Sequence, residues 1–216
     1  SIRAMFPFWR PVLSLVFLFI MLTDVVGQTI TLDFLNDSVT GGDLNITTMG
    51  SDPVDSFEGD RFDEQTSSTF QILDTMSGDS IVEVTATALL DDLNVTTSGG
   101  LADGGSGFNS AGEGTSFVFS ENVIITALDW GALGTSDFVN LRSGSEDFGD
   151  FNFGSTGPSP EDIDFSDTNP STMSINVASA DAFVIENVSG AFDLEDMTFD
   201  LDPASSTPNP ATWDDG

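Results

Sequence analysis

GGLADGGSGFNSAGEGTSFVFSENVIITALDWGALGTSDFVNL, residues 99–141, is the stretch of sequence that decides the fold class. It opens with a glycine-rich segment. Runs of β-branched and aromatic residues follow at Ser116–Phe119, Val123–Trp130 and Phe138–Leu141. Short runs of this kind, separated by Gly, Ser and Asp, are typical of antiparallel sandwiches and barrels. The stretch therefore predicts an all-β domain.

The same pattern continues on both sides of this stretch. In Ser80–Ala88 the residues alternate, so that Val82, Val84, Ala86 and Ala88 share one apolar face. About ten short strands and no helix are predicted for residues 28–203, which indicates an antiparallel two-sheet β-sandwich of jelly-roll type. The remaining predicted strands are Thr29–Phe34, Thr69–Leu73, Leu93–Thr97, Thr172–Val177, Ala182–Val188 and Leu194–Leu201. Phe148–Phe153 is predicted to be a short strand or a packed loop. A long loop with short edge strands is predicted over Asn36–Asp63.

Residues 1–27 are predicted to be a secretory signal peptide. Arg3 and Arg10 precede an apolar run at Val12–Leu22, and small residues stand before Gln28. The run is too short to cross a bilayer, which takes ~20 apolar residues. Residues 204–216 form a Pro/Ser/Thr-rich tail. We therefore expect a secreted chain, at the cell surface or extracellular, with no membrane insertion after signal cleavage.

The charge is strongly acidic, with 36 Asp and Glu against 4 Arg and a formal net charge of −32. Beyond the signal peptide the basic residues are Arg61 and Arg142. Such a chain repels phosphate backbones and anionic lipid, so nucleic acid is not an expected partner. At marine ionic strength the Debye length shrinks to roughly 3–4 Å, which weakens self-repulsion. The composition thus favours a halophilic or marine protein.

A calcium site is predicted in the glycine-rich segment. Calcium takes six to eight oxygen ligands, and loops supply them more readily than strands. Asp103, Asn109 and Glu113 would converge if the segment folds back on itself. The alternative is a solvated loop. A second acidic group, Asp162, Asp164 and Asp167, is expected to be solvated.

The missing residue types argue against an enzyme. His, Cys and Lys are absent, which excludes Ser-His-Asp and Cys-His relays, lysine Schiff bases and histidine or cysteine zinc sites. A carboxylate pair, as in glycosidases, remains open. With this many Asp and Glu residues, some pair will have the required carboxylate separation by chance, so spacing does not identify a catalytic pair. We therefore expect no catalytic residues.

Trp130 is the candidate ligand-binding residue. It ends a predicted strand, where an exposed indole could serve as a platform for a sugar ring. The alternative is a tryptophan in the core or at its rim. A carbohydrate-binding module is therefore one alternative function, with extracellular polysaccharide as the partner.

Two pieces of the chain resemble secreted β-sandwich proteins of environmental bacteria of the PEP-CTERM-associated type. They are TATALLDDLNVTTSGGLADGGSGFNSAGEGTSFVFSENVIITALDWG and FVIENVSGAFDLEDMTFDLDP. That group has a Gly-Leu-Gly-Val-like loop, where this chain has Gly100-Leu101-Ala102-Asp103. Pro208–Trp213 is similar to the Pro-Glu-Pro motif, but no sorting helix is present in this sequence, so surface anchoring is not inferred.

Together these features favour a non-enzymatic, extracellular, structural or adhesive β-sandwich protein stabilised by calcium, with a cell-surface or secreted matrix as its partner. The first alternative is the carbohydrate-binding module. The second is a carboxylate-pair glycosidase or lyase.

Overall fold

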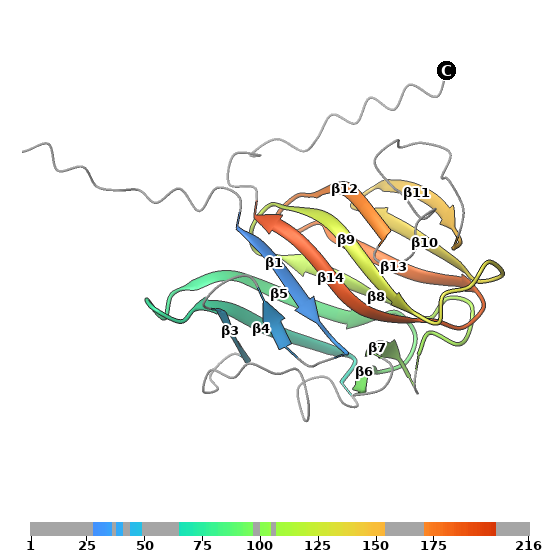
Figure 1. Ribbon diagram of the computed structural model, residues 1–216, viewed down its shortest axis with the longest axis horizontal. Helices are drawn as coiled ribbons and strands as arrows, with labels where there is room; N and C mark the ends of the chain where they lie inside the picture. Colours follow the sequence, from blue (N-terminus) through green and yellow to red (C-terminus); the bar gives the residue numbers. More distant parts are fainter. Residues whose placement is uncertain are drawn as a thin grey trace, which may run out of the picture.

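The chain is an all-β structure without helices in the part that the computed structural model describes. The described residues are 28–35, 38–40, 44–48, 65–96, 100–104, 107–153 and 171–201. They form two antiparallel sheets, in agreement with the predicted β-sandwich (Figure 1). The jelly-roll topology stays a prediction. The predicted signal peptide, the Asp162–Asp167 group and the predicted tail lie outside these residues.

The first sheet, sheet A, faces the viewer in Figure 1. Its strands follow the order β12-β9-β14-β1-β2, and the β6–β7 pair joins it through β7 and β14. The strands are β1 (Thr29–Asp33), β2 (Ser38–Thr40), β6 (Leu93–Thr96), β7 (Gly100–Asp103), β9 (Val123–Gly131), β12 (Ser171–Val177) and β14 (Asp193–Leu201).

The second sheet, sheet B, lies behind it with the order β11-β10-β13-β8-β5-β4-β3. Its strands are β3 (Leu44–Thr48), β4 (Ser67–Asp74), β5 (Ser80–Ala88), β8 (Gly114–Phe119), β10 (Phe138–Ser143), β11 (Glu146–Phe151) and β13 (Ala182–Ser189).

The core is the layer between the two sheets. Period-two alternation sends every second side chain of most strands inward, where phenylalanines fill much of the space. Phe119 on β8 meets Phe199 on β14 edge to face, with ring centroids 5.2 Å apart. This contact joins sheet B to sheet A. The core therefore depends on complementary faces of the two sheets.

Most strands match the sequence prediction, and β5 matches it residue for residue, with Val82, Val84, Ala86 and Ala88 buried. The described residues form fourteen strands, where the sequence predicts about ten. The two short strands β2 and β3 fall within Asn36–Asp63, the predicted loop with short edge strands. β2 ends the strand order of sheet A, and β3 ends that of sheet B. Strand β7 was not predicted because its Gly100–Asp103 sequence resembles the surrounding loop. No helix in the described residues has the length and apolar character needed to cross a membrane.

We predict that Phe119→Ala lowers the free energy of unfolding by about 3–5 kcal/mol, because it leaves a cavity between the sheets. Phe138→Ala is the matched control, since that ring is partly exposed on β10 and its loss should cost less than about 2 kcal/mol. Urea unfolding monitored by circular dichroism measures both values. Equal costs for the two variants would contradict this account of the core.

Candidate functional site

Asp103 lies at the end of β7 and is only 1% exposed. Its Oδ2 accepts hydrogen bonds from the backbone N–H groups of Leu89, Leu90 and Gly114, and its Oδ1 accepts one from Asp91. Four donors occupy most of the lone pairs of one carboxylate. In this structure Asp103 therefore holds the segment after β5 against the start of β8.

Glu113 and Asn109 form a second set of bonds in the same region. The Oε2 of Glu113 accepts hydrogen bonds from the backbone N–H groups of Asn109 and Ser110. The Asn109 side chain donates to the carbonyl of Gly107 at 3.0 Å. The predicted trio thus bonds to the backbone, and its calcium-binding role stays a prediction that the structure does not test.

Trp130 points into the core and is 2% exposed. Its indole meets the ring of Phe192 edge to face at 5.6 Å, and its Nε1 donates to the hydroxyl of Ser171 on β12. The face of the indole is therefore covered in this structure and is not presented to a sugar ring.

The outer face of sheet A instead carries an unpredicted row of carboxylates. Asp196 on β14 stands opposite Asp33 on β1 and opposite Asp129 on β9. Side chains directly opposite each other on neighbouring strands have Cβ atoms about 4.5–5.5 Å apart, and like charges there are destabilising. Asp196 is therefore a carboxylate with another carboxylate on each side.

A β-bulge adds Glu195 and Asp193 to this row. The register shifts between Leu194 and Asp196, so Glu195 has no partner residue of its own on β9. The extra residue allows Glu195 and Asp196 both to point outward. A Cβ built on Gly131 would lie 2.7 Å from the Oε1 of Glu195 and 3.2 Å from the Oδ2 of Asp193. Glycine at this position thus makes room for both carboxylates.

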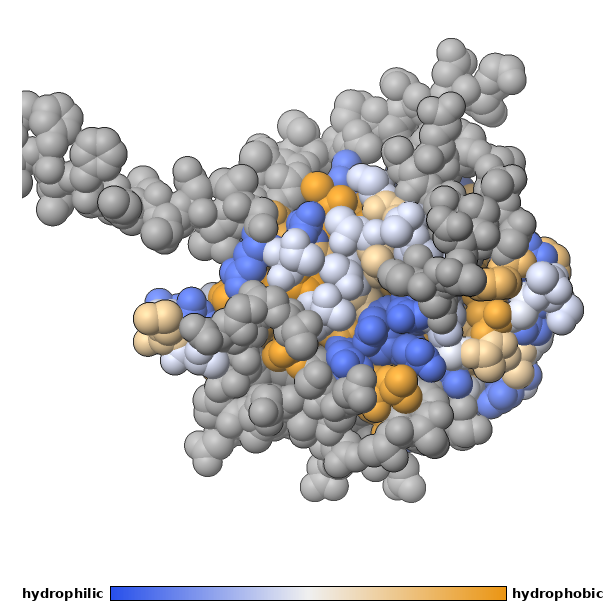
Figure 2. Space-filling model, in the orientation of Figure 1, coloured by the Kyte–Doolittle hydropathy of each residue, from blue (hydrophilic) through white to orange (hydrophobic). Residues whose placement is uncertain are grey.

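We call Asp33, Asp129, Asp193, Glu195 and Asp196 the acidic face. Figure 2 shows a hydrophilic patch over the adjoining ends of β1, β14 and β9, where these residues lie. All five side chains are partly buried. The acidic face is therefore built on three paired strands and does not depend on a loop.

Burial and mutual repulsion raise the pKa values of four of these carboxyls. The pKa of Asp196 rises to about 7 because of burial, the charges of Asp33, Asp129 and Glu195, and a hydrogen bond with Asp33. Burial and the charge of Glu195 raise the pKa of Asp193 to about 6. The pKa values of Asp129 and Glu195 are also raised, mainly by burial. The face therefore binds protons near neutral pH.

Basic side chains neutralise little of the negative charge of the acidic face. Arg142 on β10 is the one arginine among the described residues, and it pairs with Glu186 on β13 in sheet B. Among the same residues, no group of three or more Asp and Glu has an arrangement that would hold a metal ion. The acidic face is therefore a concentration of negative charge that no arginine of the described residues neutralises by an ion pair.

Sequence reasoning could not find this face because its members lie far apart along the chain. The sequence does show three acidic residues close together in β14, Asp193, Glu195 and Asp196. Their partners Asp33 and Asp129 follow only from the pairing of β14 with β1 and β9. The bulge at Glu195 is a further feature that alternation does not reveal.

Comparisons with protein-family models, curated proteins and solved structures each give no match.

We predict that Asp196→Asn stabilises the fold at pH 8 and flattens the dependence of stability on pH between 5 and 8. The pKa of Asp196 in the folded state lies above its ordinary value, so the folded protein binds more protons than the unfolded chain in this window. Stability therefore falls as pH rises toward 7. Discounted for solvent screening, removing the charge should gain roughly 1 kcal/mol at pH 8.

Thermal unfolding at several pH values, at fixed ionic strength, measures this effect. Asp200→Asn is the matched control, because it removes the same charge from the same strand, and its Oδ1 can still accept the bond from Thr29. An Asp196→Asn curve parallel to that of the parent protein would show that Asp196 does not titrate in this window.

Asp103→Asn should lower the free energy of unfolding by about 2–4 kcal/mol, because an amide nitrogen cannot accept the backbone N–H groups and charge-assisted bonds are lost. Urea unfolding measures the change. The exposed neighbour Asp91→Asn provides the control and should change stability by less than about 0.5 kcal/mol. A neutral Asp103→Asn variant would contradict the loop-closing role.

Proposed function

We propose that the protein is a non-enzymatic, extracellular, structural or adhesive β-sandwich protein whose folded state is stabilised by calcium and other cations. Its partner would be a cell-surface or secreted matrix rich in polysaccharide. The observation that carries the proposal is the acidic face, in which five partly buried carboxylates meet with no arginine of the described residues beside them.

The electrostatics explain why cations should matter. In dilute buffer the carboxylates of Asp33, Asp129 and Asp196 repel one another across three strands. A divalent ion near the row would replace proton binding as the means of relieving this repulsion. Because calcium prefers carboxylate and carbonyl oxygens, it suits such a surface in seawater-like media. Monovalent salt would help less, since it screens without bridging two carboxylates.

A structural role fits the distribution of the remaining residues. The interior between the sheets is filled by apolar side chains, with Phe117, Phe119 and Phe199 among the fully buried ones. The chain has neither His, Cys nor Lys to supply the usual nucleophiles and bases. An acidic surface that binds calcium can also bridge to anionic polysaccharide, because one ion can be shared between protein and polymer carboxylates.

We predict that millimolar calcium raises the melting temperature relative to chelator at the same ionic strength. For an apparent Kd of about 10⁻³–10⁻⁴ M, the gain at 10 mM calcium is roughly 1–3 kcal/mol. Differential scanning calorimetry at pH 8 measures it. Sodium chloride at matched ionic strength separates bridging from screening.

Two double variants test whether the acidic face causes the calcium response. Asp33→Asn with Asp196→Asn should remove most of the calcium response, while Asp147→Asn with Asp150→Asn, an equal loss of charge on β11, should leave it intact. Calcium-dependent pull-down on an anionic polysaccharide gel then tests the adhesive role. No difference between calcium and chelator would refute the calcium part of the proposal, and turnover of the polysaccharide would refute the non-enzymatic part.

A further inference from the structure

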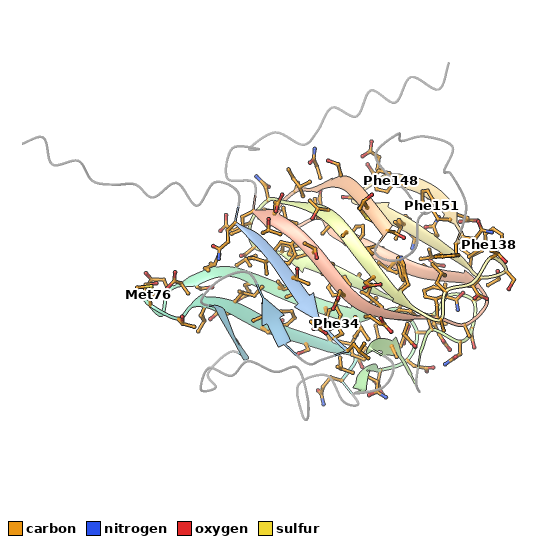
Figure 3. All side chains as sticks on the ribbon, in the orientation of Figure 1. Phe34, Met76, Phe138, Phe148 and Phe151 are labelled. Carbon is orange, nitrogen blue, oxygen red and sulfur yellow. The ribbon has the colours of Figure 1, made fainter. Side chains whose placement is uncertain are left out.

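The turn between β4 and β5 presents a single apolar side chain to solvent. Figure 3 places Met76 at the outer end of this hairpin, away from the body of the sandwich. Its side chain is 85% exposed. Most large apolar side chains of the described residues are buried, so exposure of this degree at the tip is unusual.

The turn is held in place by hydrogen bonds that do not involve the thioether. The Oδ1 of Asp74 accepts the backbone N–H groups of Met76 and Ser77 at 2.7 and 2.9 Å. The N–H of Gly78 donates to the carbonyl of Asp74, and that of Asp79 donates to the hydroxyl of Ser77. Because these hydrogen bonds fix the turn without the Met76 side chain, the thioether is exposed to solvent without contributing to the packing.

The other methionines of the described residues are protected. Met173 on β12 is 6% exposed, and Met197 on β14 is 0% exposed. The chain has no cysteine to compete for an oxidant. Susceptibility of methionine sulfur to oxidation follows its exposure. The structure therefore separates one reactive thioether from two that are shielded.

We propose that, among the methionines of the described residues, Met76 is the site at which hydrogen peroxide modifies the folded protein. The sulfur lone pair attacks one peroxide oxygen, the O–O bond breaks, and the sulfur keeps that oxygen as a sulfoxide while the other leaves as water. The thioether loses two electrons and the peroxide gains them. The product places a polar, chiral group at the tip and leaves the core unchanged.

The positions of the arginines allow oxidation of Met76 to be measured separately from that of Met173 and Met197. It contains four arginines and no lysine, so trypsin releases residues 62–142, which contain Met76, separately from residues 143–216, which contain Met173 and Met197. Folded protein is treated with hydrogen peroxide, quenched with free methionine, then unfolded and digested. Mass spectrometry follows the gain of one oxygen atom on each peptide.

Residues 62–142 should gain oxygen more than about tenfold faster than residues 143–216 in folded protein, since reactivity follows exposure. Both peptides should react at comparable rates in urea. Met76→Leu should stop the uptake on residues 62–142, which assigns it to this sulfur and not to Trp130. The melting temperature should not change on oxidation. Equal rates on the two peptides of the folded protein, or continued uptake in Met76→Leu, would overturn the proposal.

Discussion

The structure depends on the burial of one face of each sheet against the other. Phenylalanine, valine, leucine and isoleucine at alternate positions leave water only when the two sheets stack, and rings such as Phe119 and Phe199 then meet across the layer. This requirement fixes the register of every inward-facing strand, because a slip of one residue would turn its apolar side chains outward. The outward positions are consequently fixed too. The acidic face exists because the core holds β1, β14 and β9 in register.

The two faces of sheet A therefore have opposite effects on the stability of the fold. Inward side chains such as Leu32, Leu128 and Met197 stabilise the sandwich, whereas their outward neighbours Asp33, Asp129 and Asp196 repel one another. Protons or cations can relieve that repulsion without any change in the core. At a net charge of −32, the stability of the fold should therefore follow the ionic strength and the cation content of the solution.

Alternation in the sequence predicted the fold well wherever one face is buried, and Ser80–Ala88 is the clearest case. It failed at β7, because Gly100–Asp103 is buried on all sides and its glycine and aspartate resemble a loop. The spacing of Asp103, Asn109 and Glu113 in that segment predicts a calcium site. Two of these three residues are carboxylates, Asp103 and Glu113. The structure shows both carboxylates binding backbone N–H groups, a use that spacing does not distinguish from cation binding. The acidic face was beyond prediction because it joins strands distant in sequence and needs the bulge at Glu195.

The fold places Asp196 in a row of carboxylates, where burial and the neighbouring negative charges raise its pKa. The most direct test is carbon-detected NMR titration of the Asp196 carboxyl in calcium-free buffer. The expected pKa of Asp196 is about 7, raised by burial and by the neighbouring carboxylates. A single titration of Asp196 near the ordinary value of 3.8 would show that the row is not crowded, and would contradict the account.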